Sequence, residues 1–215
     1  MGESRNMKTG NSPTHQHINS PFDSHPDRVK WNDRFSNPKG FWTLGPSELL
    51  TRVLAEGISE GPVLELACGI SGNALALARA DRDVLAVDVS DVALEQVYME
   101  AEKQETASHL TCIQADLNTW RPPGSQTYAL IICVMYWEEA VFEYALKAVA
   151  DDGLIAWQGF SLNQLRYRPS QKAAWCFKAG EPAARMPETF SVLYEEDIDD
   201  GHRAIRRMIA RKMVT

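Results

Sequence analysis

The sequence lacks several features that would point to particular classes of protein. Its four cysteines, at positions 68, 112, 133 and 176, form no C-x-x-C pair. Short cysteine pairs usually mark zinc sites, so we expect no metal and four reduced thiols. No apolar run reaches the ~18–20 residues of a membrane helix, and the first 30 residues have no apolar segment like that of a signal peptide. These absences predict a cytoplasmic protein without a membrane partner.

An excess of positive charge is also absent. The 22 Lys and Arg residues against 29 Asp and Glu residues give a net charge of -7. A negative surface disfavours nucleic acid, so we expect a small-molecule partner instead. The 215 residues, 44% hydrophobic and 24% charged, suit one globular domain, which could be a monomer or a homodimer.

The chain is organised as a polar stretch followed by alternating strands and helices. Residues 1–27 show no apolar period and are expected to form a flexible tail. Residues 28–60 contain several aromatic residues, with a helix beginning near Ser47. From residue 61 to 160, continuous apolar strands alternate with helical segments, which is typical of a parallel sheet covered on both faces.

The last segment, residues 161–215, is less regular and ends in a predicted hairpin. Two strand-like runs flank "IDDG", a hairpin signal. The basic residues of the last run could form a nucleic-acid patch, but the acidic run "EEDIDD" opposite favours cross-strand charge pairs. The predicted fold class is α/β: a single Rossmann-like, doubly wound, mostly parallel seven-stranded sheet with a C-terminal antiparallel hairpin.

Three carboxylates follow three successive predicted strands. The stretch "VLELACGISGNALALA" (63–78) places Glu65 just before a turn of small residues, and Asp88 and Asp116 follow the next two strands. Ligands of such sheets bind at the carboxyl ends of the strands. A carboxylate beside the turn would repel a pyrophosphate, and the turn fits G-x-G-x-x-G poorly, which argues against a nicotinamide-dependent oxidoreductase. Amine, ribose and adenine groups would satisfy the three carboxylates, and S-adenosylmethionine carries all three.

These residues also resemble a known family. The stretches "VLELACGISGNALALA", "LAVDVS" and "QADL" resemble the first motifs of class I S-adenosylmethionine-dependent methyltransferases. "WNDRF" and "GHRAIRRMIARK" resemble the tellurite-resistance and thiopurine methyltransferase group, so the resemblance covers about residues 28–213. It implies methyl transfer from S-adenosyl-L-methionine to a small acceptor, such as a soft sulfur, selenium or tellurium nucleophile, with S-adenosyl-L-homocysteine as product.

The resemblance also assigns roles to residues. It implies a methyltransferase domain over 28–215, with 28–60 as a cover, 61–160 as the cofactor-binding core and 161–215 on the substrate side. The implied cofactor-binding residues are Trp31, Phe35, Glu65, Ala67, Cys68, Gly69, Ser71, Asp88, Val89, Asp116, Leu117, Cys133 and Val134. Those implied to face the substrate are Trp42, Gln164 and Tyr167. The alternative for the cover is a plain helix packed on the sheet edge.

Two details of the turn and of the chemistry remain open in the sequence. The family prefers G-x-G-x-G where this chain has Ala67, Gly69 and Ser71, and a positive φ at Ser71 would cost roughly 1 kcal/mol. Tyr136 and Trp137, after the fourth strand, could wall the methyl group or simply pack on the next helix.

A general base is expected only for some acceptors. A soft anion needs no base near neutral pH, whereas a hydroxyl or an amine does. The only histidine near a predicted strand end is His109, at a strand start, so we expect no histidine base; Glu138 or Tyr136 could serve. A non-catalytic S-adenosylmethionine-binding relative and a protein or nucleic-acid methyltransferase remain the alternative functions.

Overall fold

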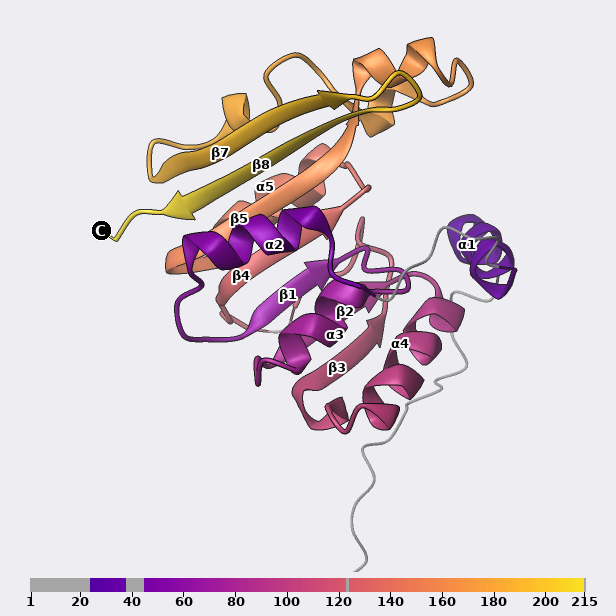
Figure 1. The fold of residues 1–215 in the computed structure, drawn as a ribbon, viewed down its shortest axis with the longest axis vertical. Helices are drawn as coiled ribbons and strands as arrows, with labels where there is room; N and C mark the ends of the chain where they lie inside the picture. Colours follow the sequence, from indigo (N-terminus) through magenta and orange to yellow (C-terminus); the bar gives the residue numbers. More distant parts are fainter. Residues whose placement is uncertain (1–23, 38–44, 123, 215) are drawn as a thin grey trace, which may run out of the picture.

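One mixed sheet organises the chain in the computed structural model, which describes residues 24–37, 45–122 and 124–214. The strand order is β3-β2-β1-β4-β5-β8-β7, with β6 paired to β5 (Figure 1). The strands are β1 (Val63–Leu66), β2 (Val84–Asp88), β3 (Leu110–Gln114), β4 (Tyr128–Val134), β5 (Val149–Ser161), β6 (Cys176–Phe177), β7 (Phe190–Asp199) and β8 (Ala204–Lys212).

The first five strands are parallel and the last two are antiparallel. β1 pairs in parallel with β2 on one side and with β4 on the other, so the strand order reverses between β1 and β4. β8 runs antiparallel to both β5 and β7. This confirms the predicted sheet and hairpin, to which β6 adds a two-residue strand in the segment that the sequence left unreadable.

Helices cover both faces of the sheet (Figure 1). They are α1 (Pro26–Ser36), α2 (Glu48–Glu56), α3 (Gly72–Ala78), α4 (Asp91–Lys103) and α5 (Glu139–Ala148), with short 3-10 turns η1 (Ala107–His109), η2 (Leu162–Arg166), η3 (Ala173–Trp175) and η4 (Ala183–Arg185). Leu49, Leu50 and Val53 of α2 pack in one buried cluster with α3 and α4, and α5 packs in the cluster on the other face. Their apolar side chains bury both sheet faces, as the continuous apolar strands require.

The ends of two elements differ from the sequence prediction. α1 begins at Pro26, inside the stretch assigned to the tail, because proline favours the first turn of a helix. The remainder of the tail, residues 1–23, lies outside the described residues. The run "EEAVFEYALKAVA" predicts a helix through residue 150, but α5 ends at Ala148 and β5 begins at once with Val149.

The charge pairs predicted across the hairpin are present. Arg206 of β8 contacts Glu195 and Asp197 of β7, and Arg207 lies 3.6 Å from Glu196. These contacts confirm the predicted cross-strand charge pairs for Arg206 and Arg207. In the described part of the chain, no helix is both long and apolar enough to cross a membrane.

Candidate active site at the carboxyl ends of the strands

The turn after β1 takes a backbone conformation that only some residues tolerate. Ala67 has φ 49° and Gly69 has φ 55°, so both lie in the left-handed region. Ser71 has φ -88° and caps α3, with its Oγ accepting from the Ala74 amide at 2.9 Å. The concern over a strained Ser71 was therefore wrong, and the left-handed conformation falls on Ala67, at a cost of roughly 1 kcal/mol.

The Glu65 carboxyl group is hydrogen-bonded to two side chains at the end of this turn. Its side chain is buried and accepts a hydrogen bond from Ser71 Oγ at 2.5 Å and another from Asn73 Nδ2 at 3.0 Å. Burial raises the pKa of Glu65 to about 7, although the two hydrogen bonds oppose the rise. The carboxyl group is therefore close to half protonated at neutral pH, and a nearby ammonium group would favour its charged form.

Asp88 connects the ends of β1 and β2. Its Oδ2 accepts from the Gly69 amide at 2.8 Å and its Oδ1 accepts from the Ser90 amide at 2.8 Å. Burial raises the pKa of Asp88, and these amides oppose the rise. A carboxylate can accept about four hydrogen bonds, so each oxygen keeps a lone pair for a ligand hydroxyl.

Asp116 lies beyond the end of β3, the strand next to β2. Its Oδ1 accepts from the Asn118 amide at 3.0 Å, and its Oδ2 is 3.4 Å from His25 Nε2. The expectation that no histidine other than His109 comes near a strand end is therefore wrong. The sequence could not show this, because His25 precedes the sheet and has no place in the strand pattern. His109 itself pairs with Asp81 and Asp83, at the other edge.

Helix α1 lies on this edge of the sheet. Arg28 donates two hydrogen bonds to Asp91 at the start of α4, at 2.9 and 2.8 Å. Asn32 donates to Asp91 at 2.7 Å, and its Oδ1 accepts from Ser90 Oγ at 2.6 Å. The buried Phe35 ring lies against Gly69, where an added Cβ would come within 3.1 Å of it. Position 69 must therefore stay glycine for two reasons, its φ and this contact.

The other aromatic residues of the predicted cover are only partly described. Trp31 is half-buried and stacks on Phe35, with ring centroids 5.6 Å apart. Trp42 lies outside the described residues. In the described part of the cover, α1 thus contacts the turn after β1 and the residues that follow β2.

Tyr136 and Trp137, the two aromatic residues after β4, have different surroundings. Tyr136 is half-buried, and burial together with the charges of Cys133, Glu138, Asp116 and Asp27 raises the pKa of its hydroxyl. It is a neutral hydrogen-bond donor at neutral pH, so it is a poor general base. Trp137 is buried among aromatic rings, with centroids 5.4 Å from Phe142 and 4.7 Å from Phe177. These contacts correspond to the packing alternative for Trp137.

The remaining predicted cofactor contacts lie along the same edge. Cys133 is fully buried at the end of β4, and Val134 ends that strand half-buried. Val89 follows β2, where its carbonyl accepts from Gln114 at 3.1 Å, and Leu117 is buried after β3. Burial raises the pKa of all four cysteine thiols, so none is a ready nucleophile.

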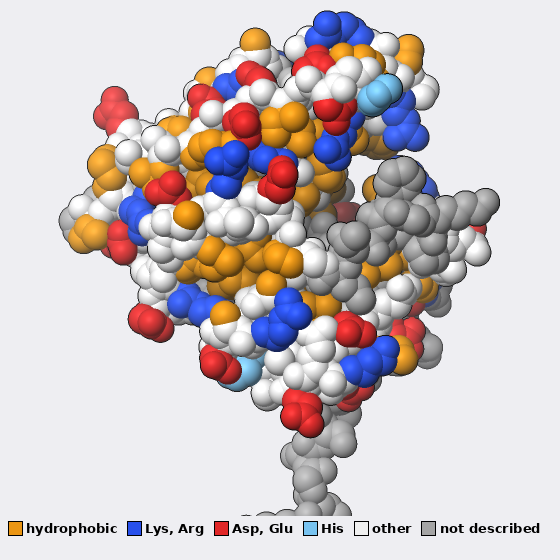
Figure 2. Space-filling model, viewed as in Figure 1, with side chains coloured by type: hydrophobic (Ala, Val, Ile, Leu, Met, Phe, Trp, Pro, Cys, Tyr) orange, Lys and Arg blue, Asp and Glu red, His pale blue; other side chains and the backbone are white. Residues whose placement is uncertain are grey.

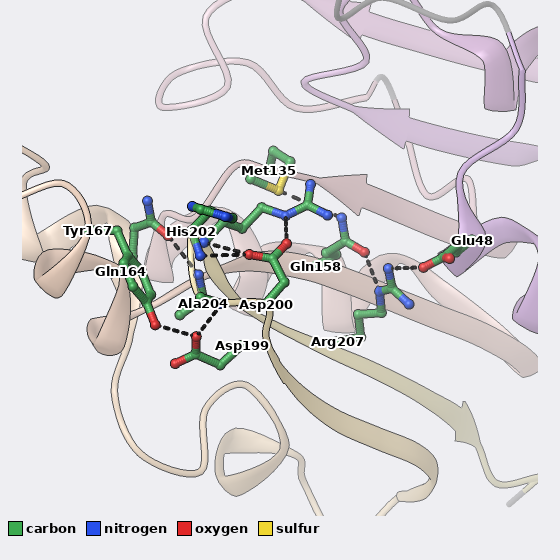
Figure 3. Close-up of polar contacts among 12 residues, drawn as sticks. Glu48, Met135, Gln158, Gln164, Tyr167, Asp199, Asp200, His202, Ala204 and Arg207 are labelled. Carbon is green, nitrogen blue, oxygen red and sulfur yellow. Dashed lines mark hydrogen bonds and ion pairs between the residues drawn. The ribbon is translucent and has the colours of Figure 1, made fainter.

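Gln164 and Tyr167, predicted to face the substrate, both contact the hairpin. Gln164 is buried, and its Oε1 accepts from the Ala204 amide at 2.8 Å. The Tyr167 hydroxyl donates to Asp199 at 2.5 Å (Figure 3). Both polar groups thus have structural partners, which the irregular sequence of this segment could not reveal.

Sequence reasoning also missed a polar row beside the end of β4. Register places Val134 beside Gln158, Gln158 beside Arg207, and Arg207 beside Glu196, across β4, β5, β8 and β7. The Arg207 guanidinium is buried in this row and donates to Gln158 at 2.6 Å. In the sequence, Arg207 is one of several basic residues in the run "AIRRMIARK", and nothing there distinguished it from its neighbours.

Comparison with known proteins supports a methyltransferase domain. Residues 63–153 match the family described as "Methyltransferase domain". No curated protein matches the sequence significantly. Among solved structures, the N-methyltransferase NodS from Bradyrhizobium japonicum WM9, in complex with S-adenosyl-L-homocysteine, has a TM-score of 0.67 at 16% identity, covering 86% of this chain and 97% of that one.

Two further structures show how widely the fold is shared. Magnesium protoporphyrin IX methyltransferase from Synechocystis PCC 6803, with the same product bound, has a TM-score of 0.60 at 14% identity, over 76% of this chain and 79% of that one. The cyclase SpnF has a TM-score of 0.61 at 14% identity, over 77% and 80%. At such identities the likeness shows the fold alone. The family match over residues 63–153, which is less than half of the chain, supports an enzyme of the methyltransferase class that uses S-adenosyl-L-methionine.

Proposed function

We propose that this enzyme methylates a small-molecule acceptor at the carboxyl ends of β1 and β4. One observation carries the proposal: Glu65 lies one residue before the end of β1, Asp88 ends β2 and Asp116 follows β3, and these three strands are neighbours in the sheet. The surface is hollowed on the right of Figure 2, below the part that carries the hairpin tip, on the side where these strands end. The hollow is the natural place for cofactor and acceptor.

The described residues fit S-adenosyl-L-methionine. Asp88 has lone pairs free for the ribose hydroxyls, and Asp116 can accept from the adenine amino group. Glu65 lies behind the turn and stabilises the amine end through charge, since its own oxygens already accept from Ser71 and Asn73. When bound, the cofactor supplies an electrophilic methyl group on a sulfonium.

The protein's part in the reaction is to hold, orient and exclude water. Phe35 against Gly69 and the α1 contacts to Asp91 place an apolar cover over the turn. An in-line displacement needs the nucleophile at about 3–3.5 Å from the methyl carbon, and this closure favours that alignment. Tyr136, a neutral donor at the end of β4, can orient an acceptor but not deprotonate it at neutral pH.

The buried thiols and the phenol at this edge supply no base at neutral pH, which favours acceptors that are already anionic. Among the described residues at this edge, neither a thiolate nor a phenolate is available, because burial raises the pKa values of Cys68, Cys133 and Tyr136. A thiolate or a selenium or tellurium anion needs no base, which supports a soft nucleophile as the acceptor.

A coupled assay for S-adenosyl-L-homocysteine tests the proposal. The panel holds thiols, thiopurines, selenite and tellurite, with an amine and a phenol as harder acceptors. We expect turnover of at least one soft acceptor and none of the harder ones at neutral pH. Cofactor binding without any turnover would favour a non-catalytic relative, and retention on heparin at moderate salt would favour a nucleic-acid methyltransferase instead.

A further inference from the structure

The polar row beside β4 contains a buried cation whose counter-ion faces solvent. The Arg207 side chain is 6% exposed, whereas its partner Glu48 is 76% exposed. Glu48 begins α2, and its Oε2 accepts from the Arg207 guanidinium (Figure 3). A buried guanidinium requires a paired carboxylate, but nothing buries this carboxylate in place. Another carboxylate can therefore replace Glu48, and Arg207 then keeps a negatively charged partner.

The remaining contacts of Arg207 hold the guanidinium in a fixed orientation. Its Nε donates to Gln158 Oε1 at 2.6 Å, and Gln158 Nε2 approaches Met135 Sδ at 3.6 Å. Glu196, 3.6 Å from Arg207, is also 3.7 Å from Arg52. Glu196 therefore lies between Arg52 and Arg207, and Glu48 is the carboxylate to which the Arg207 guanidinium donates a hydrogen bond.

This row adjoins the proposed methyl-transfer site. Arg207 is two strands from Val134, the last residue of β4, or roughly 10 Å at the usual strand spacing. Ser47, next to Glu48, donates its amide to Asn73 at 2.7 Å, and Asn73 contacts Glu65. The start of α2 therefore bridges the turn after β1 and Arg207.

Met135 gives the row an open side. It follows β4, has φ 64° and is 37% exposed. A non-glycine residue held at positive φ is uncommon and often marks a functional site. Above the hollow in Figure 2, Lys and Arg side chains lie among Asp and Glu side chains, so both signs of charge occur there.

We propose that Arg207 and Gln158 receive a carboxylate of the methyl acceptor, and that Glu48 occupies this position until the acceptor displaces it. The inference rests on the proposed function and narrows its substrate class to small molecules with a carboxylate within roughly 10 Å of the nucleophilic atom. Arg207 is then a specificity-determining residue, because a planar guanidinium can bind a carboxylate through two hydrogen bonds.

The test removes the occupant and offers a substitute. Glu48→Ala opens the position, and sodium benzoate is the probe, with benzamide as its neutral counterpart. We expect Glu48→Ala to bind benzoate at least tenfold more tightly than the wild type in calorimetry, and benzamide no better. Glu195→Ala is the matched control, because it removes a carboxylate from Arg206 in the same hairpin and should gain no benzoate binding.

A second measurement places the probe. In protein labelled at the methionine methyl groups, benzoate should shift the Met135 resonance of Glu48→Ala and leave Met213, near the C-terminus, unchanged. Equal benzoate affinity in wild type and Glu48→Ala, equal binding of benzamide, or a gain in Glu195→Ala would overturn the inference. Titration of the same samples with S-adenosyl-L-homocysteine tests the proposed function separately. Failure of the proposed function can therefore be distinguished from failure of the carboxylate-binding inference.

Discussion

At the scale of single residues, the two buried carboxyl groups of the site act differently. Asp88 accepts hydrogen bonds from backbone amides of the turn after β1 and of the start of α4. Glu65 accepts from the side chains of Ser71 and Asn73. Asp88 therefore fixes the backbone of the turn that the proposed function assigns to the cofactor, whereas Glu65 sets the charge behind that turn.

Glu65 should make stability depend on pH. Its pKa is raised from 4.5 to about 7 in the folded chain, mainly by burial, so the folded state binds more protons than the unfolded state between these values. The free energy of unfolding should fall as pH rises from about 4.5 to about 7 and then level off, by on the order of 3 kcal/mol. Glu65→Gln should remove this slope.

Urea unfolding of both proteins at pH 5, 6, 7 and 8 measures this dependence. The same group should make cofactor binding stronger at pH 8 than at pH 6, because the ammonium end favours the carboxylate. Parallel pH profiles for the wild type and Glu65→Gln would contradict the assigned role.

Asp88→Asn should weaken both the turn and cofactor binding. An asparagine can accept only one of the two amides with its oxygen, and its NH₂ group would face the other amide hydrogen. One buried donor left unpaired costs about 1–3 kcal/mol, and we expect at least a tenfold loss of affinity for S-adenosyl-L-homocysteine by calorimetry. Asp83→Asn, at the exposed opposite end of the same strand region, is the control and should change neither quantity.

At the scale of elements, helix α1 joins the site through its described contacts to α4 and to the turn after β1. It carries one buried side chain, Phe35, and is held to α4 by Arg28 and Asn32 through Asp91. A helix with so little buried apolar surface usually unfolds locally at a low free-energy cost. The polar contacts therefore decide how tightly the cover closes.

Asp91→Ala should loosen the cover without unfolding the domain. It removes the acceptor shared by Arg28 and Asn32, which are part-buried charge-assisted contacts. We expect amide hydrogen exchange in α1 to rise about tenfold and S-adenosyl-L-homocysteine to dissociate faster. Glu100→Ala removes the partner of Lys103 on the same helix and should leave α1 unchanged. Unaltered exchange in Asp91→Ala would show that α1 is held by other contacts.

The elements also show why part of the fold was predictable. Continuous apolar runs such as β4 and the Asp-Gly turn of the hairpin determine local structure strongly, so the sheet followed from the sequence. Position 67 and residues 161–187 did not, because their conformation depends on distant partners. Gln164, for example, is fixed by an amide 40 residues away. His25 at Asp116 and Arg207 at Glu48 are missed for the same reason.

At the scale of the whole molecule, charge is divided between surface and site. The net charge of -7 sets the field far from the protein, but the carboxylates at the strand ends suit a cationic cofactor and Arg207 suits an anionic acceptor. In the proposed function, these oppositely charged groups would bring a sulfonium and an anionic nucleophile together. Net charge alone could not have indicated this arrangement.

Ligand-induced stabilisation tests the cofactor at this scale. A ligand that binds only the folded chain, at 100 times its Kd, stabilises it by about 2.7 kcal/mol, which for a domain of this size raises Tm by roughly 5–10 °C. We expect this shift with S-adenosyl-L-homocysteine in thermal unfolding monitored by calorimetry. NADH at equal concentration should give no shift, since a pyrophosphate would meet the negative charges of Glu65 and Asp88 at the turn. A shift with NADH and none with the homocysteine product would reverse the assignment, because the same sheet edge would then hold a dinucleotide.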